Sequence, residues 1–282
     1  MRKEQGTWLG VTKQGRIAVL TNFREEGAIQ LEARSRGAMV NAFLTQSANI
    51  SNGTGQFVES LVEGNGLKGV GGFSLVCGRV GEPLAVISNR TPSVEGITWI
   101  VGDREKTIGL SNAAFADRSW PKVLDGEELL STAIKESVAS HGSKASFIED
   151  MFHLLSIDTL PKRSKGTGMN SYLRELRNSI FIPVVSGDGV DDMSAEDLAA
   201  ARCDQHVTAN EEIKREERGE HQSGMYGTQK QTVVLVNHQG RVTFVERSLY
   251  DATGRATTTE ECDRTFEFDV EGWTEREARR DV

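Results

Sequence analysis

The chain has 282 residues, of which 37% are hydrophobic and 26% are charged, so its composition is that of a globular protein with one large domain or two ordinary ones. Its 33 basic and 41 acidic side chains give a net charge of −8, which argues against nucleic acid or an anionic membrane surface as the main partner. Its apolar runs have the length of strands and fall short of the ~20 residues that cross a bilayer.

The charge excess lies in one segment. Residues 187–223 contain eleven acids and four bases, so this segment carries −7 and all other residues together carry −1. Large apolar side chains are scarce there, and we expect residues 187–223 to form an acidic, disordered insertion. The alternative is a docking element for a protein partner.

Cysteine usage and the first residues predict the compartment. Cys77, Cys203 and Cys262 are far apart and form no C-x-x-C pair, so neither a disulfide framework nor a zinc site is indicated. No apolar stretch follows Arg2 and Lys3, so the start does not read as a secretory signal. We expect a cytoplasmic protein without a metal site.

The pattern along the chain predicts strands, then helices, then strands again. Short runs rich in Val and Ile, separated by Gly or Asn, predict strands over residues 8–11, 17–20, 73–77, 84–88, 98–101 and 107–110, with Gly15 in a hairpin turn. Helical periodicity predicts helices over residues 38–44, 55–62, 129–138 and 147–155, with Ser143 as an N-cap. Strands return over residues 179–185, 232–236, 241–245 and 265–270. This order favours an α+β domain with antiparallel sheets.

Several blocks occur in an order that is similar to a known family. They are QGTWLGV (5–11), AVLTNFR (18–24), SRG (35–37), SNR (88–90), IGLSN (108–112), WPKV (120–123), YGT (226–228), TVVLV (232–236) and GRVTFVERS (240–248). Together they resemble the transport and Golgi organization protein 2 family, whose domain is named NRDE. The blocks span nearly the whole chain apart from the acidic segment, which makes the resemblance more specific than one short motif.

The resemblance implies a fold and a role. The fold is an N-terminal-nucleophile-hydrolase-like four-layer α/β/β/α sandwich with antiparallel sheets, in a single NRDE-type domain over residues 1–282. The role is in Golgi organisation, protein secretion and intracellular haem or lipid handling, in the cytoplasm, at the Golgi or in mitochondria. Family members usually begin with a Cys directly after the initiator Met and then carry an Asn-Arg-Asp-Glu segment. This chain starts downstream of both, so we expect an N-terminally shortened member whose first strand is missing.

Catalysis by this fold type needs a nucleophile at the mature N-terminus, where its own α-amino group acts as the general base. Position 2 is Arg, which cannot attack an amide. Self-cleavage before Thr7 would expose a new nucleophile, but Thr7 reads as part of a strand. We therefore expect a non-catalytic protein that binds a hydrophobic or anionic small molecule. The alternative is an amide hydrolase whose nucleophilic Cys lies upstream of this chain start.

Short polar groups beside predicted strands are the candidate ligand-binding residues. Hydroxyl and amide groups at strand ends can donate to a carbonyl or an oxyanion, although such residues also close turns. A guanidinium can hold a carboxylate or phosphate with two hydrogen bonds, although it can equally form a surface salt bridge. Tyr226 and Thr228 can line a pocket or lie at the start of a strand. The candidates are Thr21, Asn22, Arg36, Asn89, Arg90, Ser111, Asn112, Tyr226 and Thr228.

Haem is a further expectation from the resemblance, and the residues limit how it can be held. Four of the five histidines fall in predicted loops or turns, and His153 lies at the edge of an apolar helix face. No Cys is followed by Pro. Because tight haem ligation needs an axial His, Cys or Met, we expect transient haem handling rather than a bound prosthetic group.

Overall fold

The computed structural model describes residues 6–22, 36–46, 53–64, 66–67, 70–100, 106–161, 175–184, 227–250, 256–257 and 263–273. The chain divides into two compact units, which are described one at a time. The first comprises Met1–Ser119, Leu235–Thr243 and Glu267–Val282, and the second Trp120–Val234 and Phe244–Phe266. The acidic segment 187–223 and Tyr226 lie outside the described residues.

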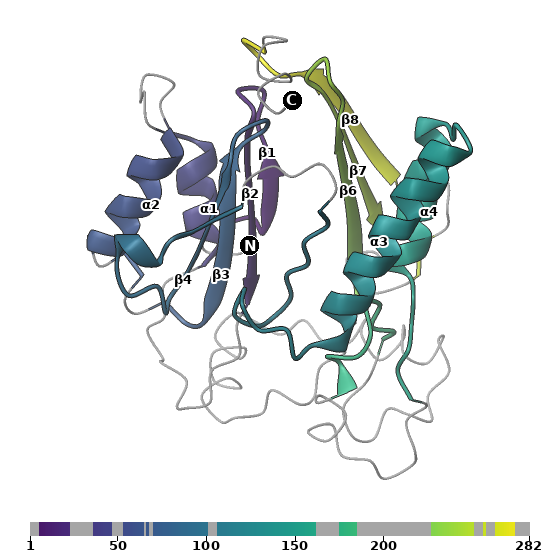
Figure 1. The fold of residues 1–282 in the computed structure, drawn as a ribbon, viewed down its shortest axis with the longest axis horizontal. Coiled ribbons are helices and arrows are strands. Elements are labelled where there is room, and N and C mark those ends of the chain that lie inside the picture. Colours follow the sequence, from purple (N-terminus) through teal and green to yellow (C-terminus); the bar gives the residue numbers. More distant parts are fainter. Residues whose placement is uncertain are drawn as a thin grey trace, which may run out of the picture. The chain divides into compact units, whose positions relative to one another are not determined.

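The first unit contains a five-stranded antiparallel sheet (Figure 1). Its order follows the sequence: β1 (Leu9–Val11), β2 (Arg16–Asn22), β3 (Phe73–Arg79), β4 (Leu84–Ser88) and β5 (Thr98–Ile100). The turn between β1 and β2 places Gly15 at φ 78°, a left-handed conformation that glycine adopts at little cost, so the predicted hairpin is confirmed. A short 3-10 turn, Val94–Gly96, precedes β5.

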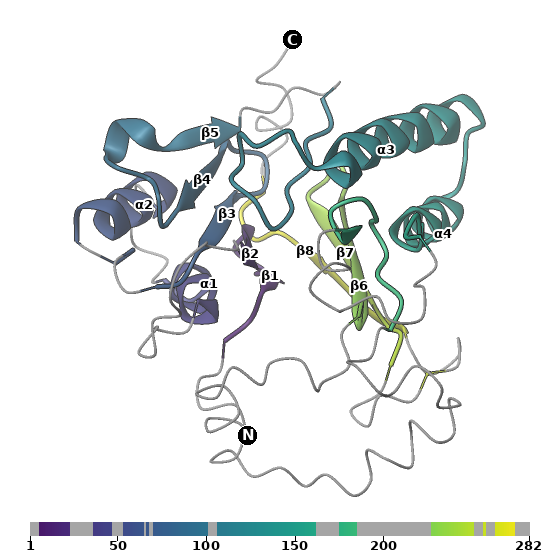
Figure 2. The ribbon, with the colours of Figure 1, turned by 90° about the horizontal axis from the view of Figure 1, so that it is seen from below.

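Two helices, α1 (Gly37–Leu44) and α2 (Gly53–Glu63), are inserted between β2 and β3 and lie on the same side of the sheet (Figure 2). Side chains alternate between the two faces of a strand, and one set of alternate residues faces these helices. The rings of Phe43 and Phe57, one from each helix, have centroids 5.1 Å apart. The buried residues of this core include Ala18, Leu20, Val40, Phe43, Phe57, Val58, Phe73, Leu75, Cys77, Ala85 and Ile87.

The second unit contains two longer helices, α3 (Pro121–Ala139) and α4 (Lys144–Leu155). The side chain of Ser143 accepts a hydrogen bond of 3.1 Å from the backbone N–H of Ser146, which confirms the predicted N-cap. At the other end of α4, the side-chain amide of Gln231 donates to the carbonyl of Leu155 at 2.9 Å. This bond satisfies a carbonyl at a helix end that has no partner within the helix.

A second antiparallel sheet has the order β6 (Lys230–Val236), β7 (Arg241–Ser248) and β8 (Asp263–Asp269). Residues 235–243 and 267–269 of this sheet belong to the first unit, and its other residues belong to the second unit. The strands of the sheet therefore run through both units. In the second unit Arg247 pairs with Asp263 on β8 at 2.7 Å and with Glu149 on α4 at 2.9 Å, and its guanidinium carbon lies 3.8 Å from the Phe152 ring centroid. Arg247 therefore joins one helix to two strands.

The observed class is mixed α+β, with two antiparallel sheets and four α-helices in the described residues. Two predicted strands are wrong. Residues 107–110 form no strand, since the sheet ends at β5. Residues 179–184 are not a strand either, because Phe181 donates to the carbonyl of Ile157 and Thr228 donates to that of Ile182, which are loop contacts rather than a ladder. A search of the described helices finds none with the length and apolar character to span a membrane.

Candidate functional site

Three hydroxyl side chains form a row across the first sheet. Strand register places Thr21 on β2 opposite Ser74 on β3, and Ser74 opposite Ser88 on β4. Directly opposed residues in antiparallel strands have Cβ atoms about 5 Å apart. Leu20 and Leu75 belong to the core beneath α1 and α2, so alternation places these three residues on the opposite face of the sheet. We call Thr21, Ser74 and Ser88 the hydroxyl row.

The three hydroxyls differ in their hydrogen bonds. Ser74 is fully buried, and its Oγ donates to the carbonyl of Ala113 at 3.3 Å. The Oγ of Ser88 accepts from the backbone N–H of Arg90 at 3.2 Å. The Oγ1 of Thr21 is buried and has no hydrogen-bond partner in the described part of the chain. A buried hydroxyl without a partner costs about 1–3 kcal/mol, so an acceptor atom of a ligand beside Thr21 would be stabilising.

Polar groups surround the Thr21 end of the row. The Oδ1 of Asn89 accepts from the backbone N–H of Phe73 at 3.3 Å, next to the strand pair of Phe73 and Asn22. The Nη1 of Arg36 donates to the Oδ1 of Asn22 at 2.8 Å, and its Nε donates to the carbonyl of Gly71 at 3.2 Å. Among the described residues no carboxylate forms an ion pair with Arg36. Asn22 alternates with Thr21 along β2, so the guanidinium lies at the strand end on the helix side of the sheet, without an ion pair to any described acid.

The guanidinium of Arg36 depends on a glycine for its position. A Cβ built on Gly71 would overlap the Nη2 of Arg36, so a larger residue at 71 would displace the side chain. Arg36 stands at the N-terminus of α1, where it makes no side-chain capping bond. The arrangement holds a cation at the end of β2, where a guanidinium can attract a carboxylate or a phosphate.

The structure brings most of the predicted residues together at this end of the sheet. Thr21, Asn22, Arg36, Asn89 and Arg90 lie at the ends of β2 and β4 or bond to residues there. The predicted pair Ser111 and Asn112 directly precedes Ala113, which bonds to the row; the Oγ of Ser111 lies 3.5 Å from the Oδ1 of Asn112. Whether these residues bind a ligand stays a prediction.

The predicted residue Thr228 bonds to a neighbouring loop. It belongs to the second unit, where its backbone N–H donates to the carbonyl of Ile182 at 2.8 Å and its Oγ1 accepts from the N–H of Ile182 at 3.0 Å. These bonds give it a structural role ahead of β6. Ser74 and Ser88 were not among the predicted site residues. A serine inside each of the apolar runs FSLVC and LAVIS was the available signal, since a polar side chain within a buried strand needs a partner.

Cys77 is the cysteine that the structure describes, and it is not a nucleophile. It is fully buried in the core between the sheet and the helices. Burial raises the pKa of its thiol to about 12, so the reactive thiolate is not populated near neutral pH. Over the described ranges, no three His, Cys, Asp or Glu side chains converge as ligands for a metal ion.

Comparison with known proteins identifies the family. The family model "Transport and Golgi organisation 2" matches residues 1–251. The chain is 26% identical over 277 residues to the human "Transport and Golgi organization protein 2 homolog", an alignment that covers 95% of this chain and 80% of the human protein. It is also 26% identical over 273 residues to the Bos taurus homolog, covering 92% and 78%. The "Uncharacterized protein YGR127W" of Saccharomyces cerevisiae is 26% identical over 280 residues, covering 93% and 81%. The chain therefore belongs to the transport and Golgi organisation 2 family.

Proposed function

We propose that this protein binds an anionic small molecule at the hydroxyl row, without catalysis, and that this binding serves the transport and Golgi organisation for which the family is named. The proposal includes intracellular haem or lipid handling, in the cytoplasm or in association with the Golgi or mitochondria. We also propose that the fold is the N-terminal-nucleophile-hydrolase-like sandwich that the resemblance implies. The two antiparallel sheets and the helices support that fold at the level of the α+β class.

The observation that carries the proposal is the buried hydroxyl of Thr21, which has no hydrogen-bond partner among the described residues. Asn22 follows Thr21 in the chain and accepts from Arg36 at 2.8 Å. A ligand carboxylate or phosphate would accept a hydrogen bond from the hydroxyl, and the guanidinium at the end of the same strand would add a longer-range attraction. Hydrogen bonds to a charged group contribute about 1.5–3 kcal/mol, more than bonds between neutral groups.

The same face of the sheet offers an apolar surface next to the row. Val19, Val76 and Val86 are paired across the same three strands, two residues from the hydroxyls. Two residues along a strand return to the same face, so the valines adjoin the hydroxyls. An anionic head at the row with an apolar body over the valines fits a haem propionate or an acyl lipid, and this supports a hydrophobic anionic ligand.

Two measurements test this proposal. Native mass spectrometry of the purified protein would identify retained small molecules, and titration with hemin would give an affinity. Thr21→Val removes the hydroxyl with little change in shape, and we expect it to weaken binding about tenfold. Thr45→Val is the matched control, because Thr45 is an exposed residue just after α1, outside the row. Equal affinities for Thr21→Val and wild type would contradict the proposal.

The amide hydrolase remains the alternative, and hydroxyl donors at strand ends are compatible with it as an oxyanion site. It needs a nucleophile, and Cys77 is excluded by its burial and raised pKa. Assay of the full chain against a panel of amide substrates separates the two functions. Turnover that persists in Cys77→Ala would show that the non-catalytic function is wrong.

A further inference from the structure

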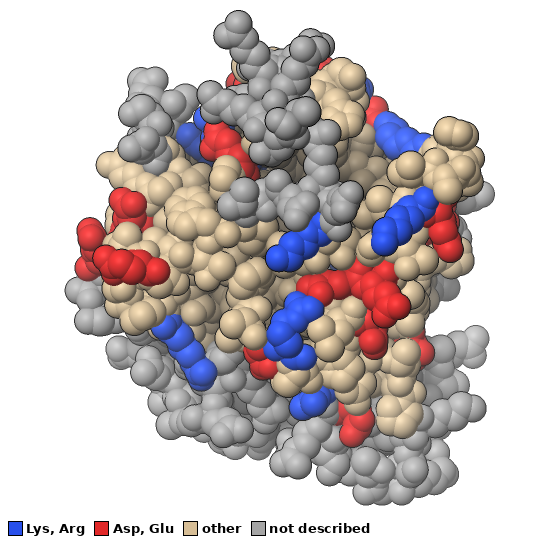
Figure 3. All heavy atoms as spheres, in the orientation of Figure 1, with Lys and Arg blue, Asp and Glu red and all other residues tan. Residues whose placement is uncertain are grey.

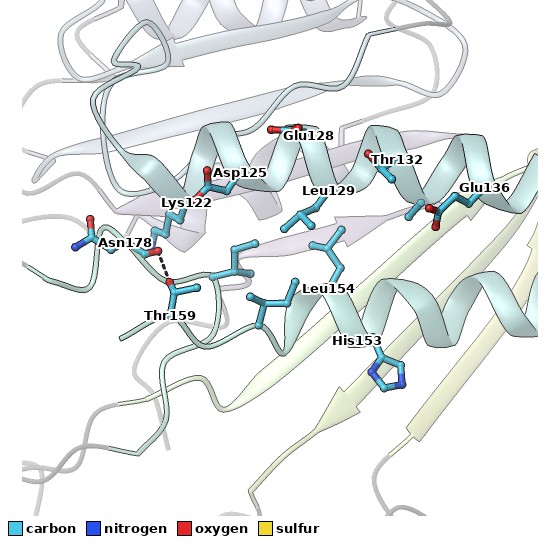
Figure 4. A pocket seen from close by; sticks show the side chains of 13 residues that line it. Lys122, Asp125, Glu128, Leu129, Thr132, Glu136, His153, Leu154, Thr159 and Asn178 are labelled. Atoms are coloured by element: carbon cyan, nitrogen blue, oxygen red, sulfur yellow. Dashed lines mark hydrogen bonds between the residues drawn. The ribbon is translucent and has the colours of Figure 1, made fainter. Parts of the chain in front are cut away.

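A groove in the second unit carries an inference that is independent of the hydroxyl row. It lies between α3 and α4, has a volume of about 680 Å³, and has Thr159 and Asn178 among the residues that line one end (Figure 4). A volume of this size is in the usual range for small-molecule sites, about 300–1,000 Å³. Its apolar lining consists of side chains that are only half-buried: Leu129, Ala133, Leu154, Ile157 and Ile180.

The apolar lining is surface that α3 and α4 do not cover themselves. Leu129 and Ala133 are one turn apart on α3, and Leu154 comes from the facing helix, so their side chains point into the same hollow. Ile157 and Ile180 are contributed by segments joined through the hydrogen bond from Phe181 to the carbonyl of Ile157. Half-buried aliphatic side chains on both walls favour an apolar ligand, because filling the groove removes them from water.

Lys122 supplies a positive charge at one end of the groove. Its side chain is half-buried, and its ammonium lies 5.3 Å from the centroid of the Trp120 ring. In the part of the chain that the structure describes, no carboxylate forms an ion pair with this ammonium. Burial lowers the pKa of Lys122, because the charged form has lost water without gaining an acidic partner. A ligand anion at this end would supply that partner.

Three acids, Asp125, Glu128 and Glu136, also line the groove, and their effect depends on distance from Lys122. All three are exposed, and Figure 3 shows a contiguous group of acidic side chains with basic side chains around it on the face drawn. The helical rise of 1.5 Å per residue places Glu128 about 9 Å and Glu136 about 21 Å along the axis from Lys122. Charges in water are screened over about 8 Å at physiological salt, so Asp125, one turn away, is the main competitor for an anion.

We propose that the groove between α3 and α4 binds a carboxylate that carries a single unbranched apolar chain, with the carboxylate at Lys122 and the chain along Leu129 and Leu154. The helical rise from Lys122 to Ala133 is about 16 Å, enough for an extended chain of roughly a dozen carbons. This site lies in the other unit from the hydroxyl row and shares no residue with it. It extends the proposed function and does not depend on it.

The test is calorimetric titration of the full chain with laurate below its micellar concentration, with dodecyltrimethylammonium as the probe of opposite charge. We expect laurate to bind and Lys122→Met to weaken its binding at least tenfold, since the variant keeps the apolar stem but lacks the charge. Asp125→Asn should tighten laurate binding about twofold to fivefold. Glu136→Gln is the matched control at the far end and should leave the affinity within twofold.

A second variant tests where the apolar chain of the ligand lies, separately from the role of the charge. Ala133→Phe fills the groove without changing any charged residue, and we expect it to abolish laurate binding. Equal laurate affinity in wild type and Lys122→Met, tighter binding of dodecyltrimethylammonium than of laurate, or no laurate binding at all would each overturn the proposal. Laurate is also an anionic acyl ligand of the class proposed for the hydroxyl row, so the two sites are separated by variant. Lys122→Met should weaken the groove site alone and Thr21→Val the row site alone, so failure at the groove is distinguishable from failure at the hydroxyl row.

Discussion

The ionisation of Lys122 follows from its burial. The pKa of Lys122 is lowered from the reference value of 10.5 by loss of water around the ammonium. The charged and titratable groups that face the same groove are Asp125, Glu128, Glu136 and His153. Between the lowered pKa and about 10.5, the unfolded chain binds more protons at this residue than the folded protein does. The contribution of Lys122 to the free energy of unfolding therefore rises with pH over this window.

This linkage gives a prediction for Lys122→Met. The variant removes a buried charge, so we expect its melting temperature at pH 7 to be about 1–3 °C above that of wild type. The difference should shrink as the pH is raised through the lowered pKa, because wild-type Lys122 then loses its proton in the folded state. Thermal unfolding across this pH range measures both effects, with Lys135→Met, an exposed position on the same helix, as the control. A variant that is less stable than wild type at pH 7 would contradict the argument.

The residues of the hydroxyl row show how far sequence reasoning reaches at a site. Thr21 and Asn22 were identified because they end an apolar run, which is a local signal. Ser74 and Ser88 were missed because their importance comes from strand register, which places them opposite Thr21 and opposite each other. Register is set by pairing between distant segments, so a single sequence without its partners does not reveal which polar residues share a row.

At the scale of elements, local patterns predicted the four described helices, although α3 begins at Pro121, eight residues before the predicted start at 129. Periodic apolar residues and the cap at Ser143 identified α4, and its capping bond is present in the structure. The strands β2, β3, β4 and β7 were also predicted, because turn residues bound each run. The prediction failed for residues 107–110 and 179–184, where the composition suits a strand. A strand needs a hydrogen-bonded neighbour, and composition alone does not supply one.

The C-terminal segment beyond β8 packs against hairpin turns of the first unit and gives a prediction at this scale. The Nε1 of Trp273 donates to the carbonyl of His238 at 3.1 Å, and the Trp273 ring covers Gly240. Gly240 has φ 78°, and a Cβ there would overlap the indole ring. We expect Gly240→Ala to lower the free energy of unfolding by about 2–4 kcal/mol, the sum of left-handed strain and overpacking. Denaturant unfolding measures the change.

Gly272 is the matched control for Gly240. Its φ is 74°, but nothing lies within 4 Å of a Cβ built on it. Gly272→Ala should therefore carry the strain alone, about 1–2 kcal/mol. In the background of Trp273→Ala, the cost of Gly240→Ala should fall to that of Gly272→Ala, since the overlapping ring is gone. If the two glycine variants are equally destabilised with Trp273 present, packing of the ring on the turn is not the cause.

At the scale of the whole molecule, chain order and compact units do not coincide. The first unit takes residues 235–243 and 267–282 from the end of the chain, after the second unit has begun. Sequence patterns identified the strands that contain these residues but not their assignment to a unit, which depends on contacts between distant segments. The expectation of a single domain over residues 1–282, and that of a docking role for the acidic segment, stay predictions.

The distribution of charge gives a prediction for the whole chain. Residues 187–223 carry −7 of the net −8, and the isoelectric point is near 5.3. Solubility is lowest where the net charge is close to zero. Replacing residues 187–223 by a short Gly-Ser linker leaves a net charge of −1, so we expect the solubility minimum to move from near pH 5 to near neutral pH. Turbidity measured against pH, at equal protein concentration, would show the shift.

A full-length variant separates charge from the loss of the segment itself. Replacing seven of the eleven acids in residues 187–223 by Asn or Gln brings the segment to zero net charge at unchanged length. Because the expected shift of the solubility minimum depends only on net charge, this variant should show the same solubility minimum as the deletion. A minimum that stays near pH 5 in the neutralised chain would mean that other parts of the molecule control association. If instead only the deletion shifts the minimum, the segment acts through its bulk rather than through its charge.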